Sequence, residues 1–231
     1  MLAENICEIS DITGDEHHFW VTNGPLFSTT LFCIPPKNFD KSHVAAVLKF
    51  YDPDGYLFNE AKVEFLVNQI GFLELANFME ACKIHNGIKH AHLFITNDVG
   101  ASFTIRAGLN GNVPMILSEP SLLSKTNASC FPMLFAPNKR TFISVINHSK
   151  TIGKFRCKLI ADKRSPEVVH EVPPLGAVLI NTEVEFPQFF SRERALPAYV
   201  RLSAVGDTVM GVTCFEESRG ESGINTYVGM N

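Results

Sequence analysis

Two segments of this chain carry the same residue pattern, and this duplication constrains the fold more than any other sequence feature. From Ala91 to Gly108, apolar and polar residues alternate, turn at Asn97-Asp98-Val99-Gly100, and alternate again. The segment from Ala198 to Phe215 repeats this order, with its turn at Val205-Gly206-Asp207. Alternation with a period of two is typical of half-buried β-strands. A short turn between two such strands indicates a β-hairpin in each segment.

The duplication extends upstream of both segments. The apolar run Gly71–Leu75 precedes the first segment at nearly the same distance at which Gly176–Ile180 precedes the second. Further upstream, each copy has a strand pattern, a polar turn and a second strand pattern, at Val47–Val63 and at Phe155–Val172. We therefore expect two copies of one β domain. Because a repeat of two cannot stack into a solenoid, each copy should bury its own core.

The strand patterns predict the fold class. About seven short strands per copy, with turn residues between them, are typical of an antiparallel β-sandwich. We predict an all-β chain of two tandem antiparallel β-sandwich domains related by an internal repeat. The apolar residues Leu75, Phe78, Met79 and Cys82 have helical spacing and predict a short amphipathic helix in the first domain. The expected boundaries are 1–109 for the first domain, 110–128 for a Pro/Ser-rich linker, 129–217 for the second domain and 218–231 for a polar tail.

Composition excludes several classes of protein. The 231 residues are 45% hydrophobic and 19% charged, which favours a globular chain with a substantial core. The net charge is −4 and there is no run of Lys or Arg, so we expect no nucleic-acid partner. No apolar run approaches the roughly 18 residues of a membrane span, and we expect none.

The first residues bear on location. Met1–Asp11 has neither a basic segment nor a continuous apolar one, so we expect no secretory signal peptide and a cytoplasmic or virion-associated protein. The six cysteines are scattered along the sequence. In such a chain, we expect them to be reduced thiols rather than disulfides.

Motifs for catalysis are missing. The sequence has no Gly-x-Ser-x-Gly, no P-loop and no Gly-x-Gly-x-x-Gly, so we predict no enzymatic activity, no catalytic residue and no cofactor. Asp52-Pro53-Asp54-Gly55 has the composition of the start of a calcium loop. The closing glutamate and the other ligands of such a loop are missing, and a hairpin turn explains the four residues.

The polar residues of greatest interest are three histidines. His90 and His92 are two residues apart on one expected strand, so both lie on the same sheet face. Two imidazoles on one face can chelate a divalent metal, with His85 or Asp98 as a further ligand. Alternatively, these histidines and Phe94 lie on a face that the other domain or a second copy of the chain covers.

Outward aromatic residues extend this candidate face. Trp20 and Tyr199 alternate away from the expected cores, and exposed aromatic rings stack on sugars or fill protein interfaces. The predicted ligand or interface face comprises His90, His92, Phe94, Tyr199 and Trp20, and the predicted metal ligands are His90, His92 and His85.

The second copy carries three packing and turn motifs in order. They are Pro173-Pro174-Leu175-Gly176-Ala177-Val178, then Phe186-Pro187-Gln188-Phe189-Phe190, then Tyr199-Val200-Arg201-Leu202. With these motifs it resembles the immunoglobulin-like or fibronectin-type β-sandwich modules of bacterial and phage surface proteins. The resemblance covers about half of each domain, and the first copy departs from it because Val67-Asn68-Gln69-Ile70 replaces the prolines. It implies a module that adheres, spaces or decorates, and it implies no catalytic residue.

Two functions remain open at the level of the sequence. The leading expectation is a non-enzymatic structural or interaction module that forms a homo-oligomer or binds another protein, as a virion, appendage or assembly component does. The alternative is a ligand-binding module for a carbohydrate or a divalent metal.

Overall fold

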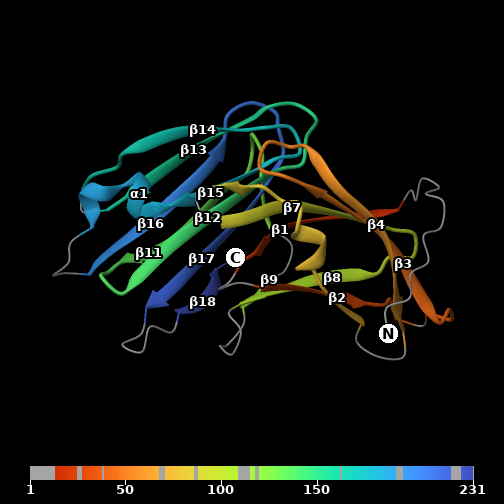
Figure 1. Cartoon of the computed structure of the whole chain (residues 1–231). Helices are drawn as coiled ribbons and strands as arrows, with labels where there is room; N and C mark the ends of the chain where they lie inside the picture. The colour runs from red at the N-terminus through yellow and green to blue at the C-terminus, as the bar shows by residue number, and fades with distance from the viewer. Residues whose placement is uncertain are drawn as a thin grey trace.

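The computed structural model describes residues 14–24, 28–37, 39–67, 71–85, 88–108, 115–117, 120–161, 163–190, 195–219 and 225–230. Their regular structure is almost entirely β-strand, arranged in four antiparallel sheets with short helical turns between strands (Figure 1). The prediction of an all-β chain is therefore confirmed. None of the helices in this part of the chain is long and apolar enough to cross a membrane.

The first half of the chain forms two sheets that pack on each other. Sheet I has the order β1 (Asp15–Asn23), β7 (Ile88–Asn97), β3 (His43–Tyr51) and β4 (Leu57–Leu66), with β6 (Ile84–His85) paired to β7. Sheet II has the order β5 (Gly71–Glu74), β2 (Ser28–Ile34), β8 (Ser102–Gly108) and β9 (Met115–Leu117). Alternate residues of both sheets, such as Phe19, Leu93, Leu31 and Ile105, form one buried cluster between them. This burial of one side chain in two follows from the alternation in the sequence.

The second half repeats this arrangement. Sheet III has the order β10 (Ser121–Leu123), β17 (Met210–Arg219), β12 (Lys139–Asn147) and β15 (Ala177–Asn181), with β18 (Asn225–Met230) paired to β17. Sheet IV has the order β11 (Ala128–Phe135), β16 (Leu196–Ala204), β13 (Gly153–Ile160) and β14 (Glu167–Val172). The cluster between them includes Phe155, Leu159, Val145 and Val212.

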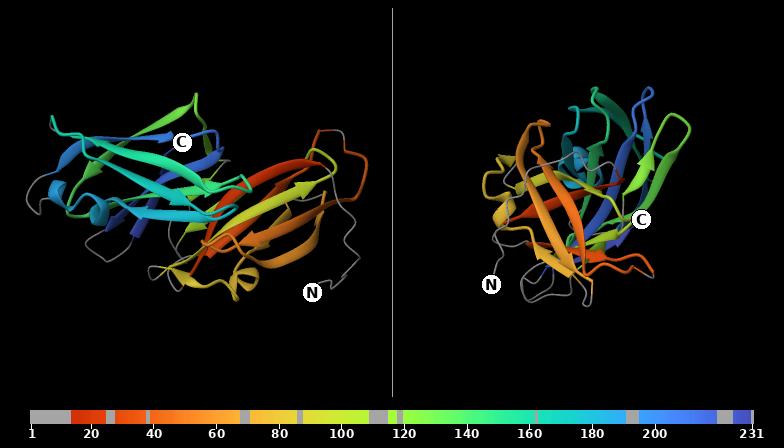
Figure 2. Two further views of the ribbon diagram at one scale, coloured as in Figure 1. Left: turned by 90° about the horizontal axis from the view of Figure 1, so that it is seen from above. Right: turned by 90° about the vertical axis from the view of Figure 1, so that its right-hand side faces the viewer.

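The two sheet pairs meet through the outer faces of sheets I and III. Phe142, Ile146 and Phe215 point away from the core between sheets III and IV and belong to the buried cluster of the first half. The rings of Trp20 on β1 and Phe215 on β17 have centroids 5.2 Å apart. The sheets therefore follow one another in the order II, I, III and IV, and Figure 2 shows the two pairs side by side.

The strand orders of the two halves coincide. When β7 is matched to β16 and β8 to β17, the order β1-β7-β3-β4 of sheet I corresponds to β11-β16-β13-β14 of sheet IV. Likewise, β5-β2-β8 of sheet II corresponds to β15-β12-β17 of sheet III. The match between β7 and β16 follows the sequence correspondence of Ala91 with Ala198.

The two predicted hairpins are wrong. β7 pairs with β1 and β3, whereas β8 pairs with β2 and β9, so the chain crosses from one sheet to the other between them. β16 and β17 also belong to different sheets. The buried side chain of Asn97 explains the first crossing, because its Oδ1 accepts hydrogen bonds from the backbone N–H groups of Val99 and Ala101. These bonds turn the chain out of sheet I, and both strands then direct their apolar residues into the same core.

Four other segments differ from their predicted structure. The expected helix at residues 75–82 is only a 3-10 turn, η1 (Asn77–Met79), although Leu75, Met79 and Cys82 are buried as the pattern required. A four-residue helix, α1 (Thr182–Glu185), and a 3-10 turn, η2 (Pro187–Phe189), occur in the second half instead. The segment expected to be a linker contributes β9 and β10, and the segment expected to be a tail contributes β18. Residues 1–13, which include Cys7, lie outside the described residues.

Candidate functional site

A cluster of three imidazoles fills part of the contact between the two halves. His18 on β1 and His92 on β7 lie on the outer face of sheet I, and His148 follows β12 of sheet III. Nδ1 of His18 is 2.9 Å from Nε2 of His92. The rings of His18 and His148 stack with centroids 3.8 Å apart and an angle of 11° between their planes.

The hydrogen bonds of this cluster fix its tautomers. Nδ1 of His92 is 2.8 Å from the carbonyl oxygen of Leu175, and a carbonyl can only accept, so this nitrogen carries the hydrogen. In a neutral imidazole the other nitrogen is then the acceptor. His18 therefore donates from Nδ1 to Nε2 of His92. This chain of donors runs from the first half of the molecule to the backbone of the second.

The three imidazoles are neutral at physiological pH. Burial lowers the pKa of His92 to about 3, and the nearby His18 lowers it further. Burial likewise lowers the pKa of His18 to about 3, with His148 and His17 as secondary causes. The pKa of His148 is lowered to about 3 by burial and by His92. The cluster is thus a tightly packed polar contact that a proton would disrupt.

Two of the predicted metal ligands, His90 and His92, form hydrogen bonds within the protein. Nε1–H of Trp20 donates to Nδ1 of His90 over 3.3 Å, and both nitrogens of His92 take part in the bonds described above. Only the backbone of His85 is described, so its side chain lies outside the described residues. Among the described residues, no group of three His, Cys, Asp or Glu side chains is placed to hold a metal ion. The metal site stays a prediction of the sequence.

The predicted face is divided between two places in the fold. Trp20, His90 and His92 are buried between sheets I and III. Phe94 is half-buried, with its ring centroid 4.9 Å from that of His18. Tyr199 is 53% exposed on the outer face of sheet IV and does not join them. The predicted face omits His148, because no local pattern in the sequence links this residue, which directly follows β12, to the strand that carries His92.

Two tight turns complete the contact between the halves. The backbone N–H of Ala177 donates to the carbonyl oxygen of Pro53 over 3.2 Å. A Cβ atom on Gly55 would lie 2.0 Å from the carbonyl oxygen of Pro174, and one on Gly176 would lie 2.5 Å from that of Pro53. Backbone atoms cannot move aside as flexible side chains can. Two glycines therefore allow the turn after β3 to dock on the turn before β15.

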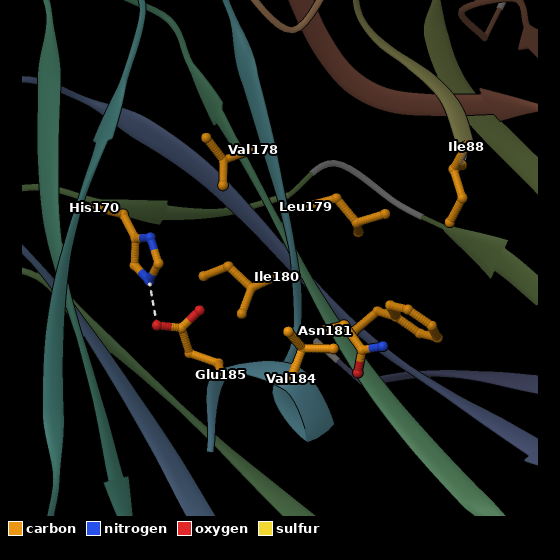
Figure 3. A pocket seen from close by; sticks show the side chains of 9 residues that line it. Ile88, His170, Val178, Leu179, Ile180, Asn181, Val184 and Glu185 are labelled. Atoms are coloured by element: carbon orange, nitrogen blue, oxygen red, sulfur yellow. Dashed lines mark ion pairs between the residues drawn. The ribbon is translucent and has the colours of Figure 1, made fainter. Parts of the chain in front are cut away.

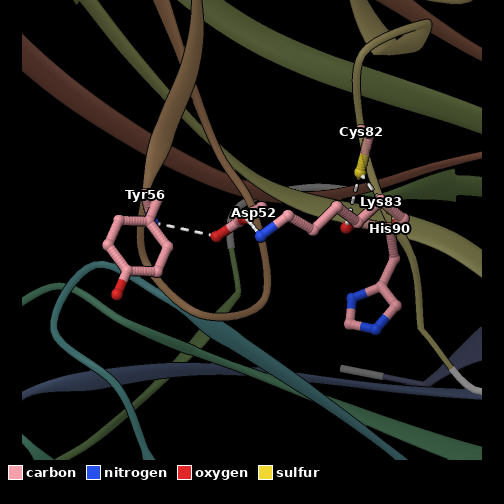
Figure 4. Close-up of polar contacts among 5 residues, drawn as sticks. All are labelled: Asp52, Tyr56, Cys82, Lys83 and His90. Atoms are coloured by element: carbon pink, nitrogen blue, oxygen red, sulfur yellow. Dashed lines mark hydrogen bonds and ion pairs between the residues drawn. The ribbon is translucent and has the colours of Figure 1, made fainter.

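The turn after β3 is held by the buried carboxylate of Asp52. Its Oδ1 accepts a hydrogen bond of 2.9 Å from the backbone N–H of Tyr56, and its Oδ2 is 3.6 Å from Nζ of Lys83 (Figure 4). Nearby, Sγ of Cys82 donates to the carbonyl oxygen of His90 over 3.3 Å. These contacts account for the Asp-Pro-Asp-Gly motif as a turn, as the sequence predicted.

One cavity of about 580 Å³ borders the same contact. Its lining is mostly apolar, and Ile88 of the first half faces Val178, Ile180 and Val184 of the second (Figure 3). Polar groups lie on one side, where Nε2 of His170 is 3.5 Å from Oε1 of Glu185. A cavity of this size and lining suits a small molecule with an apolar body.

Comparisons with known proteins add little to this geometry. No protein-family model matches the chain, and no curated protein matches it. The solved structures with some similarity to it include two that are only distantly similar. A lectin from Pleurotus ostreatus in complex with GalNAc has a TM-score of 0.16 and 10% identity over 96% of this chain and 86% of the lectin. The infectious bursal disease virus Gt strain structure has a TM-score of 0.10 and 10% identity over 97% of this chain and 87% of that one.

Proposed function

We propose that this chain is a non-enzymatic structural or interaction module that associates with itself, as a virion, appendage or assembly component does. One observation carries the proposal. Large apolar side chains are exposed on the outer faces of the two outermost sheets, with Phe72 65% exposed on sheet II and Tyr199 53% exposed on sheet IV. Exposed apolar groups on sheet faces are typical of protein interaction surfaces.

The internal contact supports the same proposal. The outer faces of sheets I and III already bury aromatic and histidine side chains against each other, so this type of β-sandwich face suits protein contact. The correspondence in strand order supports an internal repeat, in which two copies of one module are joined in tandem. The immunoglobulin-like or fibronectin-type resemblance belongs to the proposal as well, because such modules adhere or space.

Absolute mass in solution tests this function. Light scattering on the purified chain, from the low micromolar range upward, should give a mass that rises above that of one chain. A mass of one chain at every concentration would reject self-association. Pull-down of a different protein by a chain that stays monomeric would shift the proposal to a module for another partner.

A second candidate function is ligand binding, which the cavity between Ile88 and Val178 favours. Its ligand would have an apolar body and one polar group facing the His170–Glu185 pair. A carbohydrate has less support, because the buried Trp20 is unable to stack on a sugar ring. A divalent metal has less support, because among the described residues no group of three His, Cys, Asp or Glu side chains is placed to hold one. Binding should raise the melting temperature, and Val178→Trp, which narrows the cavity, should abolish the rise while leaving the fold intact. No rise with any apolar small molecule would remove this candidate.

A further inference from the structure

The outer face of sheet II carries a patch of exposed apolar side chains. Phe72 on β5 and Ile34 on β2 are 65% and 50% exposed. The half-buried Phe32 lies directly opposite Phe72 in the strand register and opposite Thr104 on the other side. Because residues in register share a face, these four side chains form one surface, which we call the sheet II patch.

The outer face of sheet IV carries a second patch. Tyr199 on β16 is 53% exposed and Ile160 on β13 is 42% exposed. Tyr199 lies in register with Ile160 on one side and with Pro132 of β11 on the other. Cys130, two residues before Pro132 on the same strand, is also exposed. We call these four side chains the sheet IV patch.

The sheet II patch occupies the position of the surface that sheet III buries. In sheet II, Phe32 pairs with Phe72 and with Thr104. In sheet III, Ile146 pairs in the same way with Ala177 on β15 and with Gly211 on β17. Ile146 and Ala177 belong to the buried cluster that sheet III forms with the first half. The sheet II patch is therefore the exposed equivalent of a docked surface.

The sheet IV patch bears the same relation to sheet I. Tyr199 lies between Pro132 and Ile160, as His92 of sheet I lies between Trp20 and Tyr51. His92 and Trp20 are the residues on which sheet III docks. Each half of the chain thus has one sheet face of each docking type. In each half, one of these faces is buried in the contact between the halves, and the other, on sheet II or sheet IV, is exposed.

We propose that a second copy of this chain docks its sheet II patch on the sheet IV patch of the first, repeating between chains the contact that sheet III makes on sheet I. This inference rests on the proposed function, namely that the chain associates with itself. The two patches are different surfaces, so the contact is head-to-tail and leaves one free patch at each end. Such contacts continue until they close into a ring or extend as a filament.

Charge disfavours a contact between two sheet IV patches. Arg201, Lys158 and Arg156 lie beside the sheet IV patch on the same face, and among the described residues only Arg156 of these three has a carboxylate partner, Glu167 at 2.8 Å. Two sheet IV patches would bring these cations together. The carboxylate of Glu74 borders the sheet II patch, where it accepts a hydrogen bond from Thr30. Arg106, in register with Thr30, is exposed on the same face, so the sheet II patch carries one charge of each sign and meets these cations without the repulsion that two sheet IV patches would have.

Two variants, each with one of the two patches blocked, test the arrangement. Phe72→Lys blocks only the sheet II patch, and Tyr199→Lys blocks only the sheet IV patch. Because both side chains are largely exposed, neither substitution should disturb folding, which circular dichroism checks. Each variant alone should be monomeric by light scattering. An equimolar mixture should form a dimer of twice the mass and no more, because one intact patch of each kind remains.

The outcomes separate the alternatives. If Tyr199→Lys alone dimerises, the sheet II patch pairs with itself, and if Phe72→Lys alone dimerises, the sheet IV patch does so; either result overturns the head-to-tail contact. Wild-type oligomers that survive both substitutions would place the contact elsewhere and overturn the inference, although self-association would stand. A monomeric wild type would reject the proposed function itself. Ile152→Lys replaces a side chain that is 57% exposed outside both patches and outside the cavity, and it should leave the assembly unchanged.

Disulfide trapping tests the contact independently. Cys130 corresponds to His18 by register, and Ile34 corresponds to His148, which stacks on His18 at 3.8 Å. In Ile34→Cys, the introduced thiol of one copy should therefore lie beside Cys130 of the next. The oxidant diamide would take up the two hydrogens as the disulfide forms, and non-reducing gels should show a ladder of multiples. Cys130→Ser in the same background should abolish the ladder; a ladder that persists, or that never forms, overturns the contact.

Discussion

Gly55 and Gly176 lie so close across the boundary between the halves that a Cβ atom on Gly176 would be 3.2 Å from the backbone nitrogen of Gly55. The two turns that carry these glycines come from segments separated by about half of the chain. Their contact places Leu175, whose carbonyl oxygen receives the hydrogen bond from His92. The histidine cluster and the glycine contact are therefore parts of one docking surface.

The first prediction concerns this glycine contact. Gly55→Ala should lower the free energy of unfolding by about 2–4 kcal/mol, because the new Cβ atom meets the carbonyl oxygen of Pro174 and φ is +85°. Gly206→Ala is the matched control, since Gly206 has φ +100° with no heavy atom within 4 Å. The control should lose only about 1 kcal/mol in urea unfolding. Equal losses in both variants would contradict the account.

The second prediction concerns pH. The folded-state pKa values of His18, His92 and His148 are lowered to about 3, below the unfolded value of 6.5. The unfolded chain therefore binds more protons between these values, and stability should fall as the pH drops below about 6.5. The loss reaches about 1.4 kcal/mol per pH unit for each histidine. Urea unfolding between pH 7.5 and 4.5 measures this slope.

One variant distinguishes the contribution of the histidine cluster to the loss of stability in acid from that of the carboxylates, which also titrate there. His148→Phe should keep the stack on His18 while removing one titrating base, so the slope between pH 6 and 4.5 should become about a third shallower. His17 and Tyr51, which also face the cluster, are unchanged in this variant. The exposed His43→Gln serves as the control. An unchanged slope in His148→Phe would mean that the cluster is not the origin of the acid sensitivity.

The third prediction concerns Asn147 at the end of β12. Its buried amide donates to the carbonyl oxygens of Thr151, Val172 and Pro173, and its Oδ1 accepts from the N–H of Ser149. Asn147→Ala would leave these groups without their partner in a buried site. It should cost about 2–4 kcal/mol in urea unfolding. A loss below about 1 kcal/mol would show that the turn before β15 does not depend on this side chain.

The fourth prediction concerns thiol reactivity. Burial raises the pKa of Cys33 and Cys82 to about 11 and that of Cys157 and Cys214 to about 12, whereas Cys130 is exposed. Of these five thiols, only Cys130 should react rapidly with an aromatic disulfide reagent in the native state. Its rate should fall as protein concentration rises, because a second copy covers it. If the fast phase of the thiol reaction is lost in Cys130→Ser, that phase belongs to Cys130. A reaction rate that does not depend on protein concentration would contradict the coverage of Cys130 by a second copy.

Much of the fold could be predicted from the sequence because alternation reports local burial. Strands at 43–51, 57–66 and 167–172 lie where the pattern placed them, and the β3–β4 hairpin forms as expected. The crossing after Asn97 could not be predicted. A tight turn within one sheet and a turn between two sheets use the same residue types, and the hydrogen bonds of the Asn97 side chain decide between them.

Only part of the candidate site could be predicted from the sequence, for a related reason. Alternation placed His92 and Trp20 on one face, but it carries no information about which distant segment covers that face. His148 and Leu175 reach it through the docking of sheet III on sheet I, a contact between residues far apart in the sequence. The helical spacing of Leu75, Met79 and Cys82 misled the prediction, because an irregular segment with one 3-10 turn buries the same residues.

Sedimentation velocity of the wild-type chain beside the double variant Phe72→Lys/Tyr199→Lys tests the central claim most directly. The account predicts that the wild type sediments as oligomers whose size grows with concentration, and that the double variant sediments as a single chain under all conditions. Wild-type protein that sediments as a single chain at high concentration, or a double variant that assembles as the wild type does, would contradict it.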